Sequence, residues 1–149
     1  MLMDDLAKAL ADGVVEALPG WVERCVESLL LAHRGSVDPA ARDAARTAGQ
    51  AAAADIGPRL AALLAADVDR QWTNPLAVVR DAVRHPTEVL RSLGVPAVRR
   101  DGFAQERFPA DDYDLTPASF ADVDPALSGP GLAWGAAKAM AHRARHGGG

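Results

Sequence analysis

Histidine and aspartate are the residues of this sequence best suited to acid–base chemistry. His85 stands before a proline, and Asp111, Asp112 and Asp114 form an acidic run further along the chain. A histidine beside a carboxylate is a common general base, so an enzyme would use His85 with one of these aspartates. The sequence contains no G-x-S-x-G motif and no glycine-rich phosphate loop. An enzyme of unrecognised type is therefore an alternative, but the sequence favours a protein without catalytic activity.

Two histidines, His142 and His146, stand four residues apart, which places both imidazoles on one face of a helix. No Asp or Glu lies near them to complete a ligand set, and the H-E-x-x-H pattern is absent. The run DDYDLTPAS lacks the glycine and the distal glutamate of a calcium loop. We therefore expect no metal ion and no cofactor.

The single cysteine, Cys25, lies within an apolar helical stripe. A reactive thiol needs a cationic, partly exposed setting, so we expect a buried, unreactive one. One cysteine cannot form an internal disulfide, which fits a reducing compartment. The opening MLMDDLAKAL carries acids where a signal peptide needs basic residues. The apolar run after it is interrupted by Glu16, Glu23 and Glu27, so no membrane span is predicted. We expect a cytoplasmic protein.

Arginines interleaved with aromatic residues are the remaining chemical feature. Arg99 and Arg100 precede Phe103 and Phe108, a pattern that can stack on and neutralise single-stranded nucleic acid. The net charge of −4 opposes this reading, because nucleic-acid binding normally needs a basic footprint. A nucleic-acid-associated regulator is therefore an alternative. Its arginine face would comprise Arg80, Arg84, Arg99, Arg100, Arg143 and Arg145.

Residues 1–72 show apolar residues at helical spacing. Leu18, Val22, Cys25 and Leu29 form one stripe, and Pro19 either starts a second helix there or kinks a long one. We expect Gly35 to end this region in the left-handed conformation. Asp38–Pro39 then pairs an N-cap with a proline at the first helical position.

A second stripe repeats every four residues, first with alanine and then with larger side chains. Its members are Ala40, Ala44, Ala48, Ala52, Ile56, Leu60, Leu64, Val68 and Trp72. The alanine half favours close helix packing, either within the chain or against a second copy, and Pro58 predicts a kink or a break.

Polar–proline pairs punctuate residues 73–130. Asn74–Pro75, Thr116–Pro117 and Asp124–Pro125 each combine an N-cap with a following proline and predict short helices. His85–Pro86 predicts a helix end, because a residue before proline avoids the helical region. Gly94, followed by Val95 and Pro96, predicts another end.

Apolar and aromatic residues recur between these pairs, which indicates an ordered strap rather than a disordered linker. Asp101–Gly102 predicts a turn of a small hairpin between Ala97 and Gln105. Whether the strap of residues 97–130 packs on the chain's own helices or on a partner stays open.

Three segments of residues 71–142 resemble a family of small uncharacterised proteins of high-GC actinobacteria with no known activity. They are TNPLAVVRDAVRHPTEVLRSLGVP, FPADDYDLTP and DVDPALSGPGLAWGAAKA. The resemblance implies a source and no catalytic role.

The sequence predicts an all-α single domain of 149 residues. We expect a helical bundle of about four to six helices, with a proline-punctuated, largely irregular segment wrapping it. Residues 1–72 would form the helical bundle half and 73–130 the short capped helices and strap. A final helix would span 131–146, before a frayed tail at 147–149.

The first functional hypothesis is a non-catalytic accessory or adaptor protein that binds another protein or a second copy of itself. Aromatic side chains dominate the energy of protein interfaces when they are central and desolvated. The predicted interaction residues are Trp72, Phe103, Phe108, Tyr113, Phe120 and Trp134, with Arg99 and Arg100.

Overall fold

The computed structural model describes residues 2–65, 75–99, 111–117 and 120–125, with positions 102, 106 and 108. Every regular element in these ranges is helical, so the predicted all-α class is confirmed there. The elements are α1 (Leu2–Arg34), α2 (Pro39–Ala65), α3 (Pro75–Arg80), the 3₁₀ turn η1 (Asp81–Val83), α4 (Arg84–Ser92) and α6 (Phe120–Val123).

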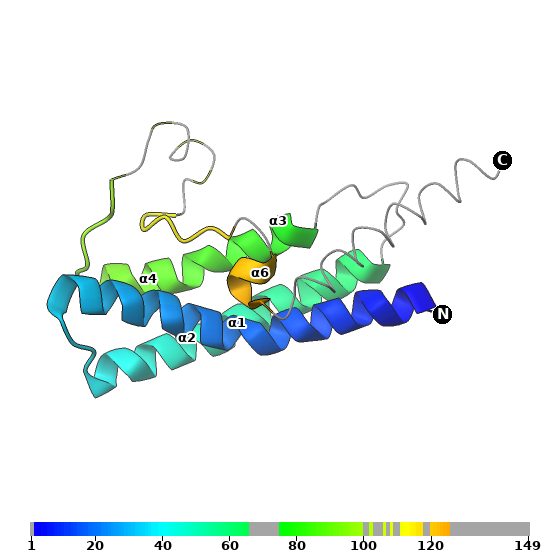
Figure 1. Ribbon diagram of the computed structural model, residues 1–149, viewed down its shortest axis with the longest axis horizontal. Helices are drawn as coiled ribbons and strands as arrows, with labels where there is room; N and C mark the ends of the chain where they lie inside the picture. Colours follow the sequence, from blue (N-terminus) through cyan, green and yellow to red (C-terminus); the bar gives the residue numbers. More distant parts are fainter. Residues whose placement is uncertain are drawn as a thin grey trace.

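Helices α1 and α2 form a long antiparallel hairpin (Figure 1). The turn between them uses the residues that the sequence predicted. Gly35 has a φ of +77°, and its N–H donates to the carbonyl of Leu31 at 2.8 Å. Asp38 then caps α2, since its Oδ1 accepts from the N–H of Ala41 at 2.7 Å. The backbone donors and acceptors at both helix ends are thereby satisfied locally.

The core stripe of α1 differs in part from the predicted one. Leu18 and Val22 are buried as expected, but Cys25 and Leu29 are only half-buried. The fully buried stripe is Val14, Leu18, Val22, Val26 and Leu30. Steps of four residues advance by about 400° around a helix, so this stripe winds around α1. Such winding suits a helix that contacts α2, α4 and α6 rather than one neighbour.

Helix α2 buries its alanine stripe against the rest of the chain. Ala48, Ala52, Ile56 and Leu60 are buried as predicted, whereas Ala40 is exposed. Ala41 and Ala45 are also buried. Each follows a member of the predicted stripe by one position. Ala44 is half-buried, so part of the stripe stays accessible, and self-association stays a prediction.

The two long helices touch at their backbones near Pro19 and Gly49. A Cβ atom added at Gly49 would lie 2.8 Å from both the Cα and the carbonyl oxygen of Pro19. Pro19 lies inside the continuous helix α1, so it does not start a second helix. Pro58 likewise lies inside α2, which excludes the predicted break there. Only glycine at position 49 permits this crossing.

We predict that Gly49→Ala destabilises the protein even though alanine is the better helix former. The added methyl would force apart two backbones, and such overpacking costs about 1–3 kcal/mol of unfolding free energy. Urea denaturation followed by circular dichroism measures the change. Gly20→Ala is the matched control, because its Cβ would meet only the flexible guanidinium of Arg24, at 3.3 Å. The control should retain or gain stability; equal behaviour of the two variants would contradict the close crossing.

Helices α3 and α4 form one helical run through η1, so the predicted helix end at His85–Pro86 is wrong. Pro86 occupies the third position of α4, within the first turn, where a backbone N–H has no partner in that helix to lose. The carbonyl four residues earlier, on Ala82, belongs to the 3₁₀ turn rather than to regular α-helix. This arrangement accommodates the proline ring that would break a regular helix.

The end of α4 is a Schellman motif, as the sequence predicted. Gly94 has a φ of +76°, and its N–H donates to the carbonyl of Arg91 at 3.0 Å. The N–H of Val95 donates to the carbonyl of Leu90, also at 3.0 Å. Val95 is buried, which adds the apolar contact typical of this motif.

Thr87 is a buried polar residue of α4 whose hydroxyl has no hydrogen-bond partner among the described residues. A buried hydroxyl without a partner costs about 1–3 kcal/mol, and an apolar group of the same shape avoids that cost.

We predict that Thr87→Val raises the unfolding free energy by about 1 kcal/mol. Thermal and urea denaturation would measure it. The same substitution at the exposed Thr47 should leave stability nearly unchanged. A loss of stability in Thr87→Val would mean that the hydroxyl is bonded in solution.

Two other local predictions fail. Gly102 and Glu106 are helical, which contradicts a hairpin turn at Asp101–Gly102. Thr116–Pro117 does not open a helix directly, since α6 begins at Phe120. Asn74, the predicted final helix at 131–146 and the tail at 147–149 lie outside the described residues.

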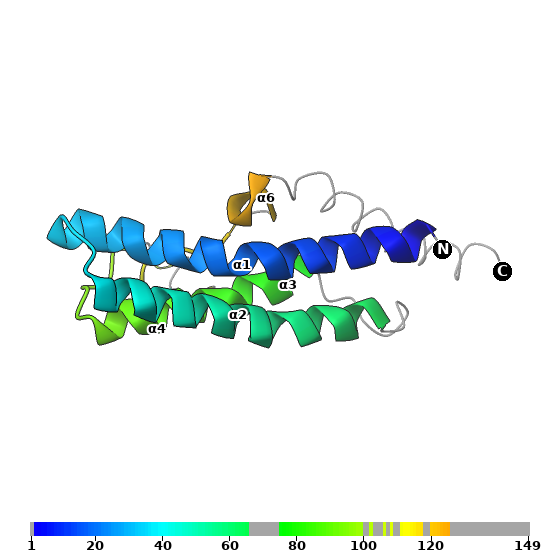
Figure 2. The same ribbon diagram turned by 90° about the horizontal axis from the view of Figure 1, so that it is seen from below.

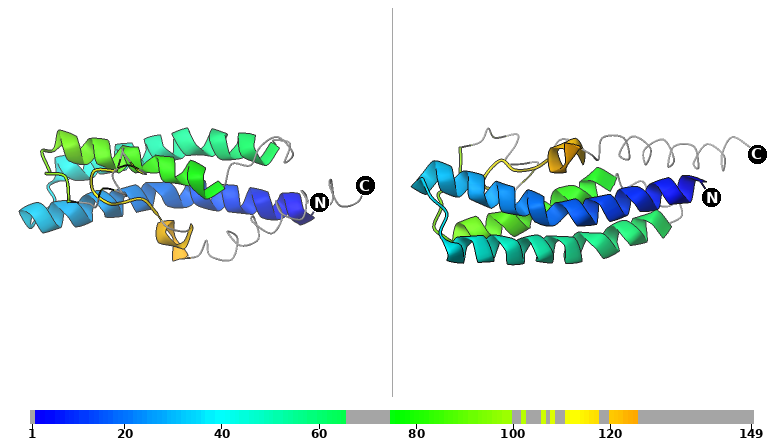
Figure 3. Two further views of the ribbon diagram at one scale, coloured as in Figure 1. Left: turned by 90° about the horizontal axis from the view of Figure 1, so that it is seen from above. Right: turned by 60° about the horizontal axis from the view of Figure 1, so that its bottom comes forward.

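The described parts of 95–123 lie against α1, α3 and α4 (Figures 2 and 3). Arg24 on α1 donates to the carbonyl of Val123 at 2.7 Å. Arg80 on α3 donates to the carbonyl of Pro117 at 3.1 Å, and Arg91 on α4 pairs with Asp112 at 2.5 Å. These contacts lie along the seam between α1 and the α3–α4 run. None of these three contacts lies in the seam between α2 and α4.

Candidate functional site

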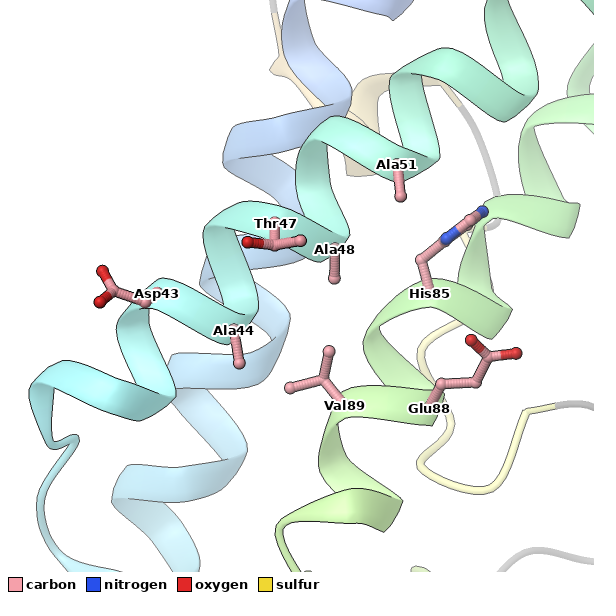
Figure 4. A pocket seen from close by; sticks show the side chains of 8 residues that line it. All are labelled: Asp43, Ala44, Thr47, Ala48, Ala51, His85, Glu88 and Val89. Atoms are coloured by element: carbon pink, nitrogen blue, oxygen red, sulfur yellow. The ribbon is translucent and has the colours of Figure 1, made fainter.

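The candidate site is an open groove of ≈390 Å³ between α2 and α4 (Figure 4). Small and apolar side chains form its floor, and polar side chains stand among them. The lining comprises Asp43, Ala44, Thr47, Ala48 and Ala51 from α2, with His85, Glu88 and Val89 from α4.

The groove follows directly from the alanine content of α2. Ala44, Ala48 and Ala51 stand at positions i, i+4 and i+7, so they share one helix face. Their methyl groups are too short to fill the space beside α4. From α4, Val89 points toward this face (Figure 4), but a single valine leaves most of the length of the groove open.

Carboxylates are the only fully charged groups that line the groove. Asp43 stands on α2 and Glu88 on α4, and both are exposed. Arg46 lies 3.6 Å from Asp43 in an i, i+3 pair, but exposed pairs of this kind are weak. No lysine or arginine is among the lining residues, but Arg84 and Arg91 of α4 interact electrostatically with Glu88, so arginines of this chain stand beside both carboxylates.

His85 joins the groove to an ionic network between α2 and α4. Its Nε2 lies 3.0 Å from Oδ2 of Asp55, which also accepts a hydrogen bond from Arg84 at 2.9 Å. Arg59 stands 3.8 Å from the other carboxylate oxygen and bonds to Asp81 of η1. Burial raises the pKa of Asp55, but the hydrogen bonds from His85 and Arg84 outweigh it and lower that pKa below its usual value.

The predicted pairing of His85 with an aspartate of 111–114 is therefore wrong. Asp111 is buried, and it accepts hydrogen bonds from the backbone N–H groups of Leu115 and Thr116, both at 2.8 Å. The Thr116 hydroxyl also donates to it, at 2.6 Å. Asp112 pairs with Arg91. These carboxylates stabilise the loop, and the partner of His85 comes instead from α2.

The predicted aromatic interaction residues have different locations. Tyr113 is buried, and its hydroxyl donates to the carbonyl of Val95 at 2.6 Å, so it belongs to the core. Phe108 is half-buried, and the guanidinium of Arg80 lies 5.9 Å from its ring centroid. Phe120 begins α6, but its side chain is outside the described part, as are Trp72, Phe103 and Trp134.

Most of the described arginines of the predicted basic face donate hydrogen bonds to acceptors within this chain. Arg80 bonds to the Pro117 carbonyl and Arg84 to Asp55. Arg99 is exposed, whereas Arg100 lies outside the described residues, as do the two at 143 and 145. The charge of Arg84 is thus balanced within the chain, and Arg80 is turned toward the strap.

Cys25 has the properties expected of a structural thiol. It is a free cysteine, half-buried on α1. Burial raises its pKa to about 12, while the charge of Arg24 lowers the pKa and that of Asp111 raises it. The thiol is therefore protonated at neutral pH and is a poor nucleophile.

The groove was missed in the sequence because its residues were assigned to other roles. The alanine stripe was interpreted as a helix-packing face, which is true for Ala48 and Ala52. Asp55 and His85 are separated by 30 residues, and no local pattern links them. The available signal was Ala51, an alanine beside the stripe that widens the small-residue face.

Comparison with protein-family models, curated proteins and solved structures finds no match for this chain. The resemblance to actinobacterial proteins therefore stays a prediction. Among the described residues there is no group of three or more metal-ligating side chains, and none of the described helices has the length and apolar character to cross a membrane.

We predict that the Asp55 network makes stability depend on pH in the acid range. The carboxylate has a lower pKa in the folded chain than in the unfolded chain, where it is near 3.8. Its contribution is therefore present above about pH 4 and is lost as the pH falls through the folded-state pKa. Asp55→Asn should lower the unfolding free energy by about 1 kcal/mol at pH 6.

The same variant should lose less stability than the wild type between about pH 6 and pH 3. Urea denaturation at each pH measures this difference. Asp43→Asn, at an exposed position on the same helix, should follow the wild-type profile. Parallel profiles for the wild type and Asp55→Asn would contradict the network.

Proposed function

We propose that this chain is a non-catalytic adaptor that binds another protein in the α2–α4 groove. The observation that carries this proposal is the difference between the two seams of α4. The seam toward α1 is occupied by described parts of 95–123, which contribute the buried Val95, Tyr113 and Val123. The seam toward α2 is an open groove with an alanine floor.

The chemistry of the lining supports binding rather than turnover. The floor is apolar, and the ring of His85 is already hydrogen-bonded through Nε2 to Asp55. An apolar floor with a few polar groups at the edges is the usual composition of a recognition site. In this proposal His85 and Asp55 hold α4 at a set distance from α2, and the groove recognises the partner.

The strap has a structural role in this proposal. Tyr113 and Val123 are buried against their own chain, so these two residues of the strap stabilise the fold in this proposal. The adaptor then binds its partner through the groove. It acts in the cytoplasm, where the single Cys25 stays reduced.

We predict that a photo-crosslinking residue at position 51 captures a partner protein. Ala51 is exposed in the groove, so p-benzoylphenylalanine placed there would touch a bound protein without disturbing the core. The full chain would be expressed in its native cells, irradiated and resolved by denaturing electrophoresis. One heterologous adduct is expected, with the cross-link mapped to residue 51 by mass spectrometry.

The same residue at position 61 is the matched control, since Ala61 is also exposed on α2 but does not line the groove. It should give no adduct. Identical adducts from both positions, or none from position 51, would overturn the proposed site.

A further inference from the structure

We infer that residues 111–117, named here the latch loop, open and close as a preformed unit while the helices stay folded. This conformational device goes beyond the proposed function and does not depend on it. The latch loop satisfies its backbone through its own side chains, and few buried groups fasten it to the α3–α4 run, beside which it lies (Figure 1, yellow).

The latch loop carries its own hydrogen-bond framework. Asp111 is buried, and its carboxylate accepts from the backbone N–H groups of Leu115 and Thr116, both at 2.8 Å. The Thr116 hydroxyl donates to the same carboxylate at 2.6 Å. Asp114, with a φ of +57°, adopts the left-handed conformation that aspartate tolerates. Because the acceptor and these donors all belong to the loop, their bonds can persist when the loop leaves the helices.

Tyr113 is the buried anchor that fastens the latch loop to the end of α4. Its hydroxyl donates to the carbonyl of Val95 at 2.6 Å. Burial and the nearby charge of Asp112 raise the pKa of Tyr113, so the hydroxyl stays protonated and able to donate near neutral pH. The contact joins the loop to the turn that ends α4, and it must break when the loop opens.

The other contacts of the latch loop with its neighbours are polar and partly exposed. The N–H of Val98 donates to the carbonyl of Asp112 at 3.0 Å, and the exposed Arg91 pairs with the Asp112 carboxylate. Arg80 donates to the carbonyl of Pro117 at 3.1 Å. Water can replace such partners when the loop opens, and exposed ion pairs contribute little to the closed state.

The core beneath the latch loop is formed largely by α1, α2 and the α3–α4 run. The loop contributes the buried Tyr113, with Leu115 packed partly against the core. Segments with few buried apolar contacts open at a lower free energy than the core does. Opening therefore exposes Tyr113 and the end of α4 while the helices remain packed, which gives the chain a second accessible state.

Native-state hydrogen exchange of the full-length chain labelled with ¹⁵N tests this, with urea added below the unfolding transition. The Val98 amide reports opening, since its bond to Asp112 joins the loop to the preceding segment. The amides of Leu115 and Thr116 report the internal framework of the loop. The amide of Val22, in the buried stripe of α1, reports global unfolding.

We expect the Val98 amide to exchange at least about a hundred-fold faster than the Val22 amide, after correction for intrinsic rates. The exchange of Val98 should increase with urea, but less steeply than that of Val22, because opening exposes less surface than unfolding. Leu115 and Thr116 should exchange more slowly than Val98, since Asp111 moves with them.

Two variants separate opening from unfolding. Tyr113→Phe keeps the ring but removes the hydroxyl bonded to Val95, and it should speed exchange of the Val98 amide about five-fold. Ile56→Val, in the buried face of α2, is the control. It should speed exchange of Val22 about five-fold and leave Val98 unchanged, because opening of the loop keeps α2 packed.

Each contrary result overturns a stated part of the inference. Equal acceleration of Val98 and Val22 in Ile56→Val would mean that the loop opens only when the whole chain unfolds. Exchange of Leu115 and Thr116 at the rate of Val98 would mean that the loop does not move as a preformed unit. An unchanged Val98 rate in Tyr113→Phe would remove Tyr113 as the anchor. The cross-link at position 51 tests the groove separately, so either proposal can fail without the other.

Discussion

The backbone contact between α1 and α2 at Pro19 and Gly49 is the constraint on which the rest of the structure depends. Glycine at position 49, with Ala45 and Ala52 one turn to either side, lets two long helices approach more closely than bulky residues would allow. The larger aliphatic residues of α1 and the end of α2 then fill the core around this crossing. The α3–α4 run lies along the resulting hairpin and contacts both helices.

The same alanine-rich helix explains why α4 leaves a groove on its α2 side. Methyl groups at positions 44 and 51 offer α4 little apolar surface to bury, so polar contacts contribute to holding the two helices together. These contacts join Asp55 to Arg84 and His85, and Arg59 to Asp81. The ionic network fixes the separation of α2 and α4 at one end. The small residues beside it leave the surface between the two helices accessible.

The segment after α4 is held by a different kind of interaction. Backbone without regular structure leaves carbonyl groups that need hydrogen-bond donors, and arginine supplies several donors from one side chain. Arg24, Arg34 and Arg80 each donate to a carbonyl outside their own helix. Asp111 performs the complementary task by accepting from backbone N–H groups of its loop. Arginine side chains thus hold the segment after α4 against the helices.

The sequence by itself determined the helical class and the turns at Gly35, Asp38 and Gly94, because capping uses hydrogen bonds between residues a few positions apart. It did not determine which of its prolines end helices: helix α4 continues through Pro86 because the preceding turn is 3₁₀. The groove could be predicted only as a stripe of small residues. Its place between α2 and α4 and the pairing of His85 with Asp55 depend on contacts between distant segments, and only the tertiary structure decided them.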